Sequence, residues 1–265
     1  MATCLLTIAY DGTDYGGWQR QVDRVTVQQR IEEAFATIFG ERVVVEGAGR
    51  TDAGVHALAQ AAHVVLPRPF DVGQLLPALN ANLPDDIAVR AVRSAPDGFH
   101  ARFCAVGKRY VYRCVVGRLR PALGRRYFHW VRRPLDLAAM RGAGRALVGR
   151  HDFAAFATNP GYTRKHGTVR TLQHLRLVER HRGFDLAVQG DGFLYNMVRA
   201  IAGTLIDVGT GRLRQDDVAA ILQSRDRRQG GPVAPACGLY LARVLYPARL
   251  QPAPSACADP DDTVS

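Results

Sequence analysis

Hydrophobic positions in the first part of the chain recur with two different spacings. Between Val25 and Phe39 they recur every three or four residues, the period of an amphipathic helix, and Gly40 follows as a stop signal. Short apolar runs bounded by turn residues, such as the run before Asp11-Gly12, are typical of strands. In chain order these patterns predict a strand over 4–9, a helix over 25–39, strands over 42–46 and 60–66, a helix over 71–80 and a strand over 87–92.

The second part of the chain repeats that order without repeating the sequence. The patterns predict a strand over 108–116, a helix over 135–147, strands over 172–179 and 184–189, helices over 193–208 and 215–222, and a strand over 238–245. A β-α-β-β-α-β order that occurs twice predicts an α+β fold of two ferredoxin-like (RRM-like) halves. We expect the halves to span 1–106 and 107–248, with a disordered tail over 249–265 and a functional site in the cleft between the halves.

The charge of the chain narrows the class of partner. The 265 residues carry a formal net charge of +11, which indicates a polyanionic partner, either nucleic acid or an anionic membrane surface. No apolar run approaches the ~20 residues of a membrane span, and the N-terminus lacks the basic region of a signal peptide. The five cysteines contain no C-x-x-C pair, so neither a disulfide framework nor a zinc site is indicated. We therefore expect a soluble cytoplasmic protein without a membrane contact.

The segment Gly47–His56 (GAGRTDAGVH) concentrates the candidate chemistry. Its glycines let the backbone approach a ligand closely, and Arg50 stands two positions from Asp52, where a positive charge favours an ionised carboxylate. An ionised carboxylate on such a loop suits a nucleophile or a general base. In the alternative interpretation, Thr51 or Asp52 caps a short helix. The glycine spacing excludes a dinucleotide fingerprint and a P-loop, and no metal-ligand motif accompanies the nearby histidines.

Three further clusters combine aromatic, basic and amide side chains. The segment YDGTDYGGWQRQ after the first strand suits base stacking and phosphate contact. FHARF alternates aromatic and basic residues, and KRYVY opens a strand in which Tyr110 and Tyr112 share one face; one of them belongs to the core and the other could stack on a base. Arg199 lies among apolar neighbours in FLYNMVR and therefore requires a buried partner, which a purely structural ion pair would also provide.

These motifs together, with GLYL near the end, resemble the bacterial tRNA pseudouridine synthase A family from about Leu5 to Tyr246. The resemblance implies two ferredoxin-like halves related by pseudo-twofold symmetry, with sheets flanking a central basic cleft. It implies isomerisation of uridine to pseudouridine at positions 38, 39 and 40 of the tRNA anticodon stem-loop. It also implies a homodimer that needs no metal and no organic cofactor.

The resemblance also assigns roles to individual residues. Asp52 matches the catalytic nucleophile, which attacks either the base or the ribose, and Arg199 matches its basic partner. Arg50 matches the arginine that fills the space left by the flipped nucleotide, a step that costs a few kcal/mol, and Tyr110 matches the tyrosine that stacks on the flipped base. The RNA-contacting positions implied are Phe99, His100, Ala101, Arg102, Phe103 and Arg118.

Two other functions stay open at this point. A non-catalytic RNA-binding protein with paired RRM-like halves would place its aromatics on central strands, whereas Asp52 is predicted on a loop. A metal-dependent nuclease built on Asp11, Asp14 and Asp52 would need further acidic residues, which the sequence does not cluster there. The loop over 157–168 matches the family poorly, so no contact is assigned to its residues.

Overall fold

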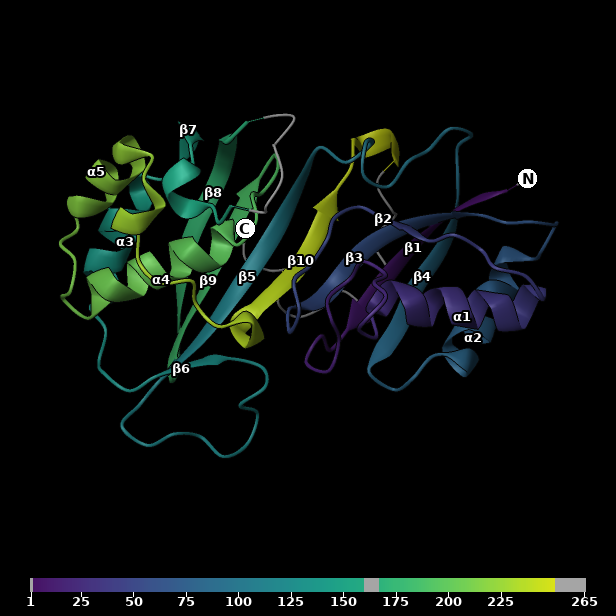
Figure 1. Cartoon of the computed structure of the whole chain (residues 1–265), viewed down its shortest axis with the longest axis horizontal. Helices are drawn as coiled ribbons and strands as arrows, with labels where there is room; N and C mark the ends of the chain where they lie inside the picture. Colours follow the sequence, from purple (N-terminus) through teal and green to yellow (C-terminus); the bar gives the residue numbers. More distant parts are fainter. Residues whose placement is uncertain (1, 160–166, 251–265) are drawn as a thin grey trace.

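The computed structural model describes residues 2–159 and 167–250, in which ten strands form one sheet (Figure 1). The first half contains β1 (Thr3–Tyr10), α1 (Val27–Phe39), β2 (Glu46–Gly47), β3 (His56–Val65), α2 (Val72–Asn82) and β4 (Ile87–Ala95). The second half contains β5 (Gly107–Val116), β6 (His129–Val131), α3 (Leu137–Arg145), β7 (Gly149–Asp152), β8 (Val169–Arg180), β9 (Gly183–Gly190), α4 (Met197–Gly209), α5 (Asp217–Ser224) and β10 (Leu239–Leu245). The predicted tail lies outside the described residues from residue 251 onward, as does 160–166 of the 157–168 loop.

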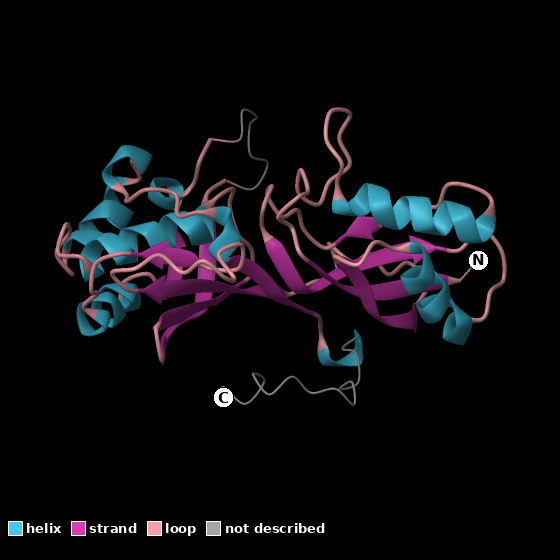
Figure 2. Cartoon of the chain, turned by 90° about the horizontal axis from the view of Figure 1, so that it is seen from below, coloured by secondary structure: helices cyan, strands magenta, loops and turns pink. Residues whose placement is uncertain are grey.

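Each half has the strand order of a ferredoxin-like fold. In the first half the order is β4-β1-β3-β2, and in the second it is β10-β5-β9-β8, so both halves read fourth, first, third, second. Neighbouring strands within these two orders are antiparallel, and the short β6 pairs with β5 in parallel. Figure 2 shows the long helix α1 and the helices of the second half on the same side of the sheet. The predicted α+β fold of two ferredoxin-like halves is confirmed.

The two halves are joined edge to edge by a short parallel pairing. Tyr240 and Leu241 of β10 lie opposite His56 and Ala57 of β3. The third strand of one half thus pairs with the fourth strand of the other. Through this pairing the two halves form one continuous sheet.

The strand predicted over 42–46 is mostly absent because side chains of α1 occupy its backbone groups. The Gln28 amide donates to the Val45 carbonyl (2.9 Å), and the Val45 amide donates to the buried Glu32 carboxylate (3.5 Å). Only Glu46 and Gly47 pair with β3 in this segment. Helix boundaries follow the capping residues more closely than the hydrophobic period does, since Thr26 and Asp71 accept bonds from the first turns of α1 and α2.

Two elements of the second half depart from the sequence prediction. The helix predicted from residue 193 begins only at Met197, because Asn196 adopts a left-handed conformation (φ 60°) that a helix interior does not allow. The short strands β6 and β7 were not predicted, and both are too short and too polar for a period-two pattern. No helix in the described part of the chain is long and apolar enough to cross a bilayer.

Candidate active site

The loop that carries Asp52 is fixed by backbone contacts on both sides. The Trp18 amide donates to the Thr51 carbonyl (3.1 Å), and the hydroxyls of Tyr10 and Thr51 share a hydrogen bond (2.7 Å). The loop then closes in a turn, in which the Val55 amide donates to the Asp52 carbonyl (3.1 Å) and Gly54 takes the positive φ of 77°. The chain continues as β3, so the alternative in which a helix begins after Asp52 is wrong.

The YDGTDYGGWQRQ segment supports this loop rather than RNA. Tyr10, Tyr15 and Trp18 are all buried, so the interpretation of this segment as a base-stacking surface is wrong. Its glycine at position 17 has φ 94°, and a Cβ there would lie 2.5 Å from the Thr51 carbonyl oxygen. The segment therefore serves as a close-packed base for the Asp52 loop.

Asp52 meets Arg199, which comes from the first turn of α4. The Arg199 Nη1 lies 3.4 Å from Asp52 Oδ2, across 147 positions of sequence. The guanidinium is held in place by two further acceptors, the Ala234 carbonyl (2.7 Å from Nε) and the Asn196 side chain (2.8 Å from Nη1). The structure thus brings together the two residues that the resemblance pairs as carboxylate and basic partner.

Burial has the largest effect on the pKa of Asp52. Desolvation raises the pKa of this carboxyl above its ordinary value, and the charge and hydrogen bond of Arg199 act in the opposite direction. Arg50 is exposed and makes no ion pair with any described residue, so the expectation that Arg50 keeps Asp52 ionised is wrong. The guanidinium that favours the charged form comes from the other half of the molecule.

Tyr110 lies beside this pair on β5. Its ring is buried and meets the ring of Phe193 edge to face at 5.0 Å between centroids. Burial, with smaller contributions from Tyr10 and Asp52, raises the pKa of its phenol, so the hydroxyl stays protonated. Tyr112, on the same face of the strand, belongs to the core and donates to the Pro235 carbonyl (3.1 Å).

The FHARF segment forms a turn that exposes only part of its residues. The side chains of Phe99 and Ala101 are buried, and their expected contact with RNA stays a prediction. Arg102 and Phe103 are exposed and stack on each other, with the guanidinium 5.8 Å from the ring centroid. Arg118 is exposed on the loop after β5.

That loop, over 117–128, docks on the first half in a way the sequence did not indicate. Arg126 forms an ion pair with Asp14 (3.1 Å), and the Tyr127 hydroxyl donates to Asp11 (2.8 Å). The buried His56, four positions after Asp52, donates from Nε2 to the Arg126 carbonyl (3.0 Å). The loop over 117–128 is therefore held by hydrogen bonds and an ion pair to residues next to the Asp52 loop.

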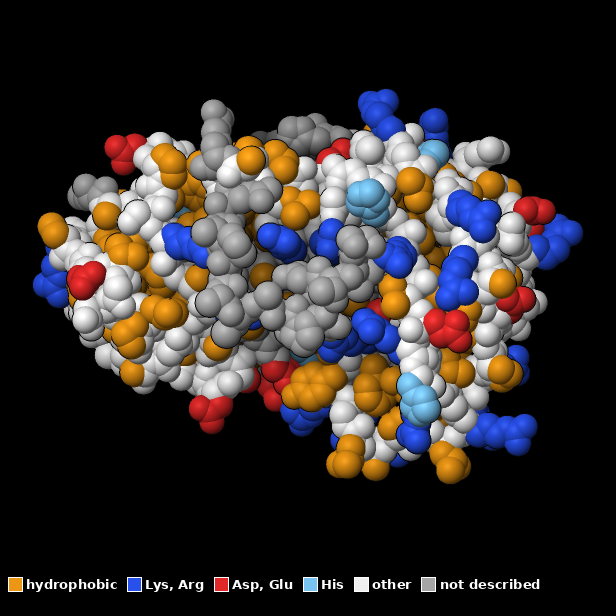
Figure 3. Space-filling view, turned by 180° about the vertical axis from the view of Figure 1, so that it is seen from behind, with side chains coloured by type: hydrophobic (Ala, Val, Ile, Leu, Met, Phe, Trp, Pro, Cys, Tyr) orange, Lys and Arg blue, Asp and Glu red, His pale blue; other side chains and the backbone are white. Residues whose placement is uncertain are grey.

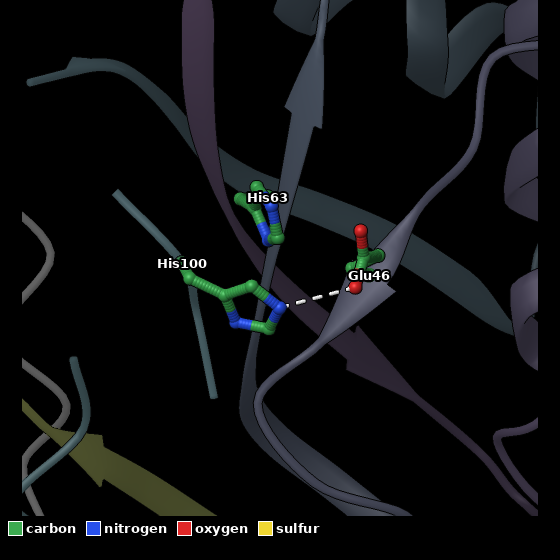
Figure 4. Close-up of side chains that lie close together, drawn as sticks. All are labelled: Glu46, His63 and His100. Atoms are coloured by element: carbon green, nitrogen blue, oxygen red, sulfur yellow. Dashed lines mark hydrogen bonds and ion pairs between the residues drawn. The ribbon is translucent and has the colours of Figure 1, made fainter. Parts of the chain in front are cut away.

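Glu46, His63 and His100 form the group whose spacing could hold a metal ion among the described residues (Figure 4). His100 Nδ1 accepts from the Arg102 and Phe103 amides, so the proton resides on Nε2, which donates to Glu46 (3.1 Å). His63 Nδ1 likewise accepts from the Ala101 amide (3.3 Å). A histidine that binds a metal through one nitrogen donates from the other, and here both other nitrogens face donors. The group therefore fits a hydrogen-bonded anchor for the FHARF turn, not a metal site.

We expect metal removal to leave the protein unchanged. Because His100 is bonded to Glu46 and His63 accepts from the Ala101 amide, dialysis against EDTA should alter neither the Tm nor the rate of tRNA modification. Thermal unfolding with EDTA, and with added zinc, checks this. A Tm that falls with EDTA and recovers with zinc would contradict the hydrogen-bonded assignment.

The surface charge agrees with a polyanionic partner. Figure 3 shows Lys and Arg side chains gathered across the middle of the face that lies behind the view of Figure 1, beside the atoms drawn in grey. This face therefore presents a group of positive side chains at its middle. Such a concentration attracts RNA at long range and makes the affinity dependent on salt.

Comparison with known proteins identifies the family. The sequence model described as tRNA pseudouridine synthase matches residues 6–104 and 143–247. tRNA pseudouridine synthase A of Syntrophotalea carbinolica is 45% identical over 93% of this chain and 97% of its own, and that of Clostridium kluyveri is 40% identical over 93% and 100%. A solved archaeal box H/ACA sRNP Nop10–Cbf5 complex covers 86% of this chain and 60% of that chain at 11% identity, with a TM-score of 0.35 that carries no weight here. The chain therefore belongs to the tRNA pseudouridine synthase family and is an isomerase that acts on tRNA.

Proposed function

We propose that the chain isomerises uridine to pseudouridine at positions 38, 39 and 40 of the tRNA anticodon stem-loop, with Asp52 as the nucleophile. The observation that carries the proposal is the pair that Asp52, on its glycine-rich loop, forms with Arg199 of α4, next to the buried Tyr110. In the reaction the C1′–N1 bond of the nucleotide breaks, a C1′–C5 bond forms, and the C5 hydrogen leaves to solvent while N1 gains a proton. No redox step is involved.

The residues divide the work according to their surroundings. Asp52 attacks either the base or the ribose in its ionised form, which Arg199 favours against the cost of burial. Arg50 is exposed on the same loop, which suits a side chain that fills the space of the extruded nucleotide. The Tyr110 ring is held by Phe193 and offers its face or hydroxyl to the flipped base.

We propose a homodimer in the cytoplasm as the working form. The four described cysteines, at positions 4, 104, 114 and 237, are all free, which suits a reducing compartment. The halves proposed over 1–106 and 107–248 would each supply part of the site, since Asp52 and Arg199 come from opposite sides of the junction.

A tRNA labelled with tritium at uracil C5 tests the proposed targets. We expect the enzyme to release one tritium for each uridine at positions 38, 39 and 40, because C–C bond formation displaces that hydrogen. A transcript in which these uridines are replaced by cytidine is the matched control. Undiminished release from the control transcript would refute the assignment of targets while leaving the isomerase chemistry intact.

A further inference from the structure

Lys108 is one of two lysines in the chain, and its ammonium group has no hydrogen-bond or ion-pair partner among the residues that the structure describes. The side chain starts from β5, two positions before Tyr110, so both lie on the same face of the strand, about 7 Å apart. Lys108 is half-buried. A partly desolvated ammonium without an acceptor costs free energy unless an anion completes the site.

The Asp52 loop is shaped around this side chain. Gly49 lies against it, and a Cβ at position 49 would stand 3.0 Å from the Lys108 Cε and 3.2 Å from its Nζ. The Gly49 carbonyl is already bound by the Gln60 amide (2.8 Å). The loop therefore makes room for the lysine without offering it an acceptor, three positions before Asp52.

In the described part of the chain, the two charges that act on the Lys108 ammonium are both cations. Desolvation lowers the pKa of Lys108 to about 8, and the charges of Arg102, from the FHARF turn, and Arg170, from β8, contribute in the same direction. Among residues 2–159 and 167–250, no carboxylate contributes to this shift. A lysine packed against a glycine, with two arginines close enough to lower its pKa, has the chemistry of an anion site.

We propose that Lys108 and Arg102 form a subsite for one backbone phosphate of the tRNA, next to the uridine that is modified. The subsite rests on the proposed function for the identity of the anion, and it adds a residue that holds the RNA in register with Asp52 and Tyr110. A phosphate there neutralises the excess positive charge and restores the ordinary basicity of the lysine. Lys108 is a positioning residue, since it reaches the backbone of the RNA and not the reacting base.

The test measures tRNA binding as a function of salt and pH. Lys108→Gln should lower the slope of log K against log [salt] by about one, whereas Arg145→Gln, an exposed cation on α3, should leave the slope unchanged. The affinity of the wild-type enzyme should fall as the pH rises through 8, because the lysine loses its proton. Lys108→Arg should keep the affinity and remove this pH dependence, since arginine stays protonated.

A second readout follows the lysine itself. With two lysines in the chain, the Lys108 amine is resolved by NMR and assigned through Lys108→Arg. Its titration should move upward from about 8 when an unmodified tRNA transcript binds. Binding by the Asp52→Asn protein should give the same shift, so failure of the nucleophile proposal and failure of the subsite are distinguishable. An unshifted titration, or a salt slope unaffected by Lys108→Gln, would overturn the subsite.

Discussion

Replacing Asp52 by Asn is expected to abolish pseudouridine formation while leaving tRNA binding intact. Asparagine has the same shape but no nucleophilic oxygen, and loss of a catalytic nucleophile costs on the order of 10⁴-fold or more in rate. Tritium release and filter binding on the same preparations measure the two effects. Asp23→Asn, at an exposed loop position, is the matched control and should retain full activity. Measurable turnover close to wild type would remove Asp52 from the chemistry.

The same substitution has an expected effect on stability. The pKa of Asp52 is raised in the folded state, so the stability that its protonated form provides is present at low pH and is lost as the pH rises through the folded pKa. The Asp52→Asn variant does not undergo this loss and should be at least as stable as the wild type at pH 7. The difference should shrink as the pH falls toward the ordinary carboxyl value of 3.8. Urea unfolding at several pH values measures it; a clearly less stable variant at pH 7 would show that the ion pair outweighs the cost of burial.

Replacing Arg199 by Gln is the second large expected effect. The guanidinium lowers the pKa of Asp52, so its removal raises that pKa further and moves the acidic limb of the kcat profile to higher pH. We expect kcat at pH 7 to fall roughly 10²-fold, the usual cost of one lost charge-stabilising donor. The measurement is a pH–rate profile by tritium release.

Two further variants separate this effect from damage to the fold. Arg212→Gln, an exposed residue beyond the end of α4 that pairs with Asp207 (3.3 Å), should leave the profile unchanged. Arg199→Lys should restore part of the rate and part of the shift, because it keeps the charge but loses the fork that also reaches Ala234 and Asn196. A lower kcat with no shift of the acidic limb would assign Arg199 to packing alone.

The sequence patterns predicted those elements well whose formation depends only on residues close by in the sequence. The amphipathic period of α1 and the turn glycines fall where the structure has them, because both depend on neighbouring residues. The segment over 42–46 reads as a strand because Val43 and Val45 alternate toward the core, yet its backbone is bound by α1 side chains. Such competition between a side chain and a strand partner is a tertiary effect, which a local pattern does not contain.

The active site shows the same contrast between features that depend on neighbouring residues and features that depend on tertiary contacts. Asp52 stands out from its loop chemistry, and its pairing with Arg199 was expected through the family resemblance, since 147 positions separate the two residues. Reasoning from proximity chose Arg50 instead, which is exposed to solvent. The aromatics of the YDGTDYGGWQRQ segment were interpreted as a binding surface because composition does not tell which ring is buried. Nothing in the sequence was a reason to select Lys108, because one lysine in a strand forms no motif with its neighbours.

The parallel pairing of β10 with β3 has a consequence for how the enzyme is made. In the described sheet β10 stands between the two halves, and it is the last strand in chain order. A nascent chain emerging from the ribosome can fold its first half early, because domains form as units during synthesis. The junction that sets Arg199 against Asp52 has to wait for residues 239–245. The active site can therefore form only after β10 has been synthesised, however early the first half folds.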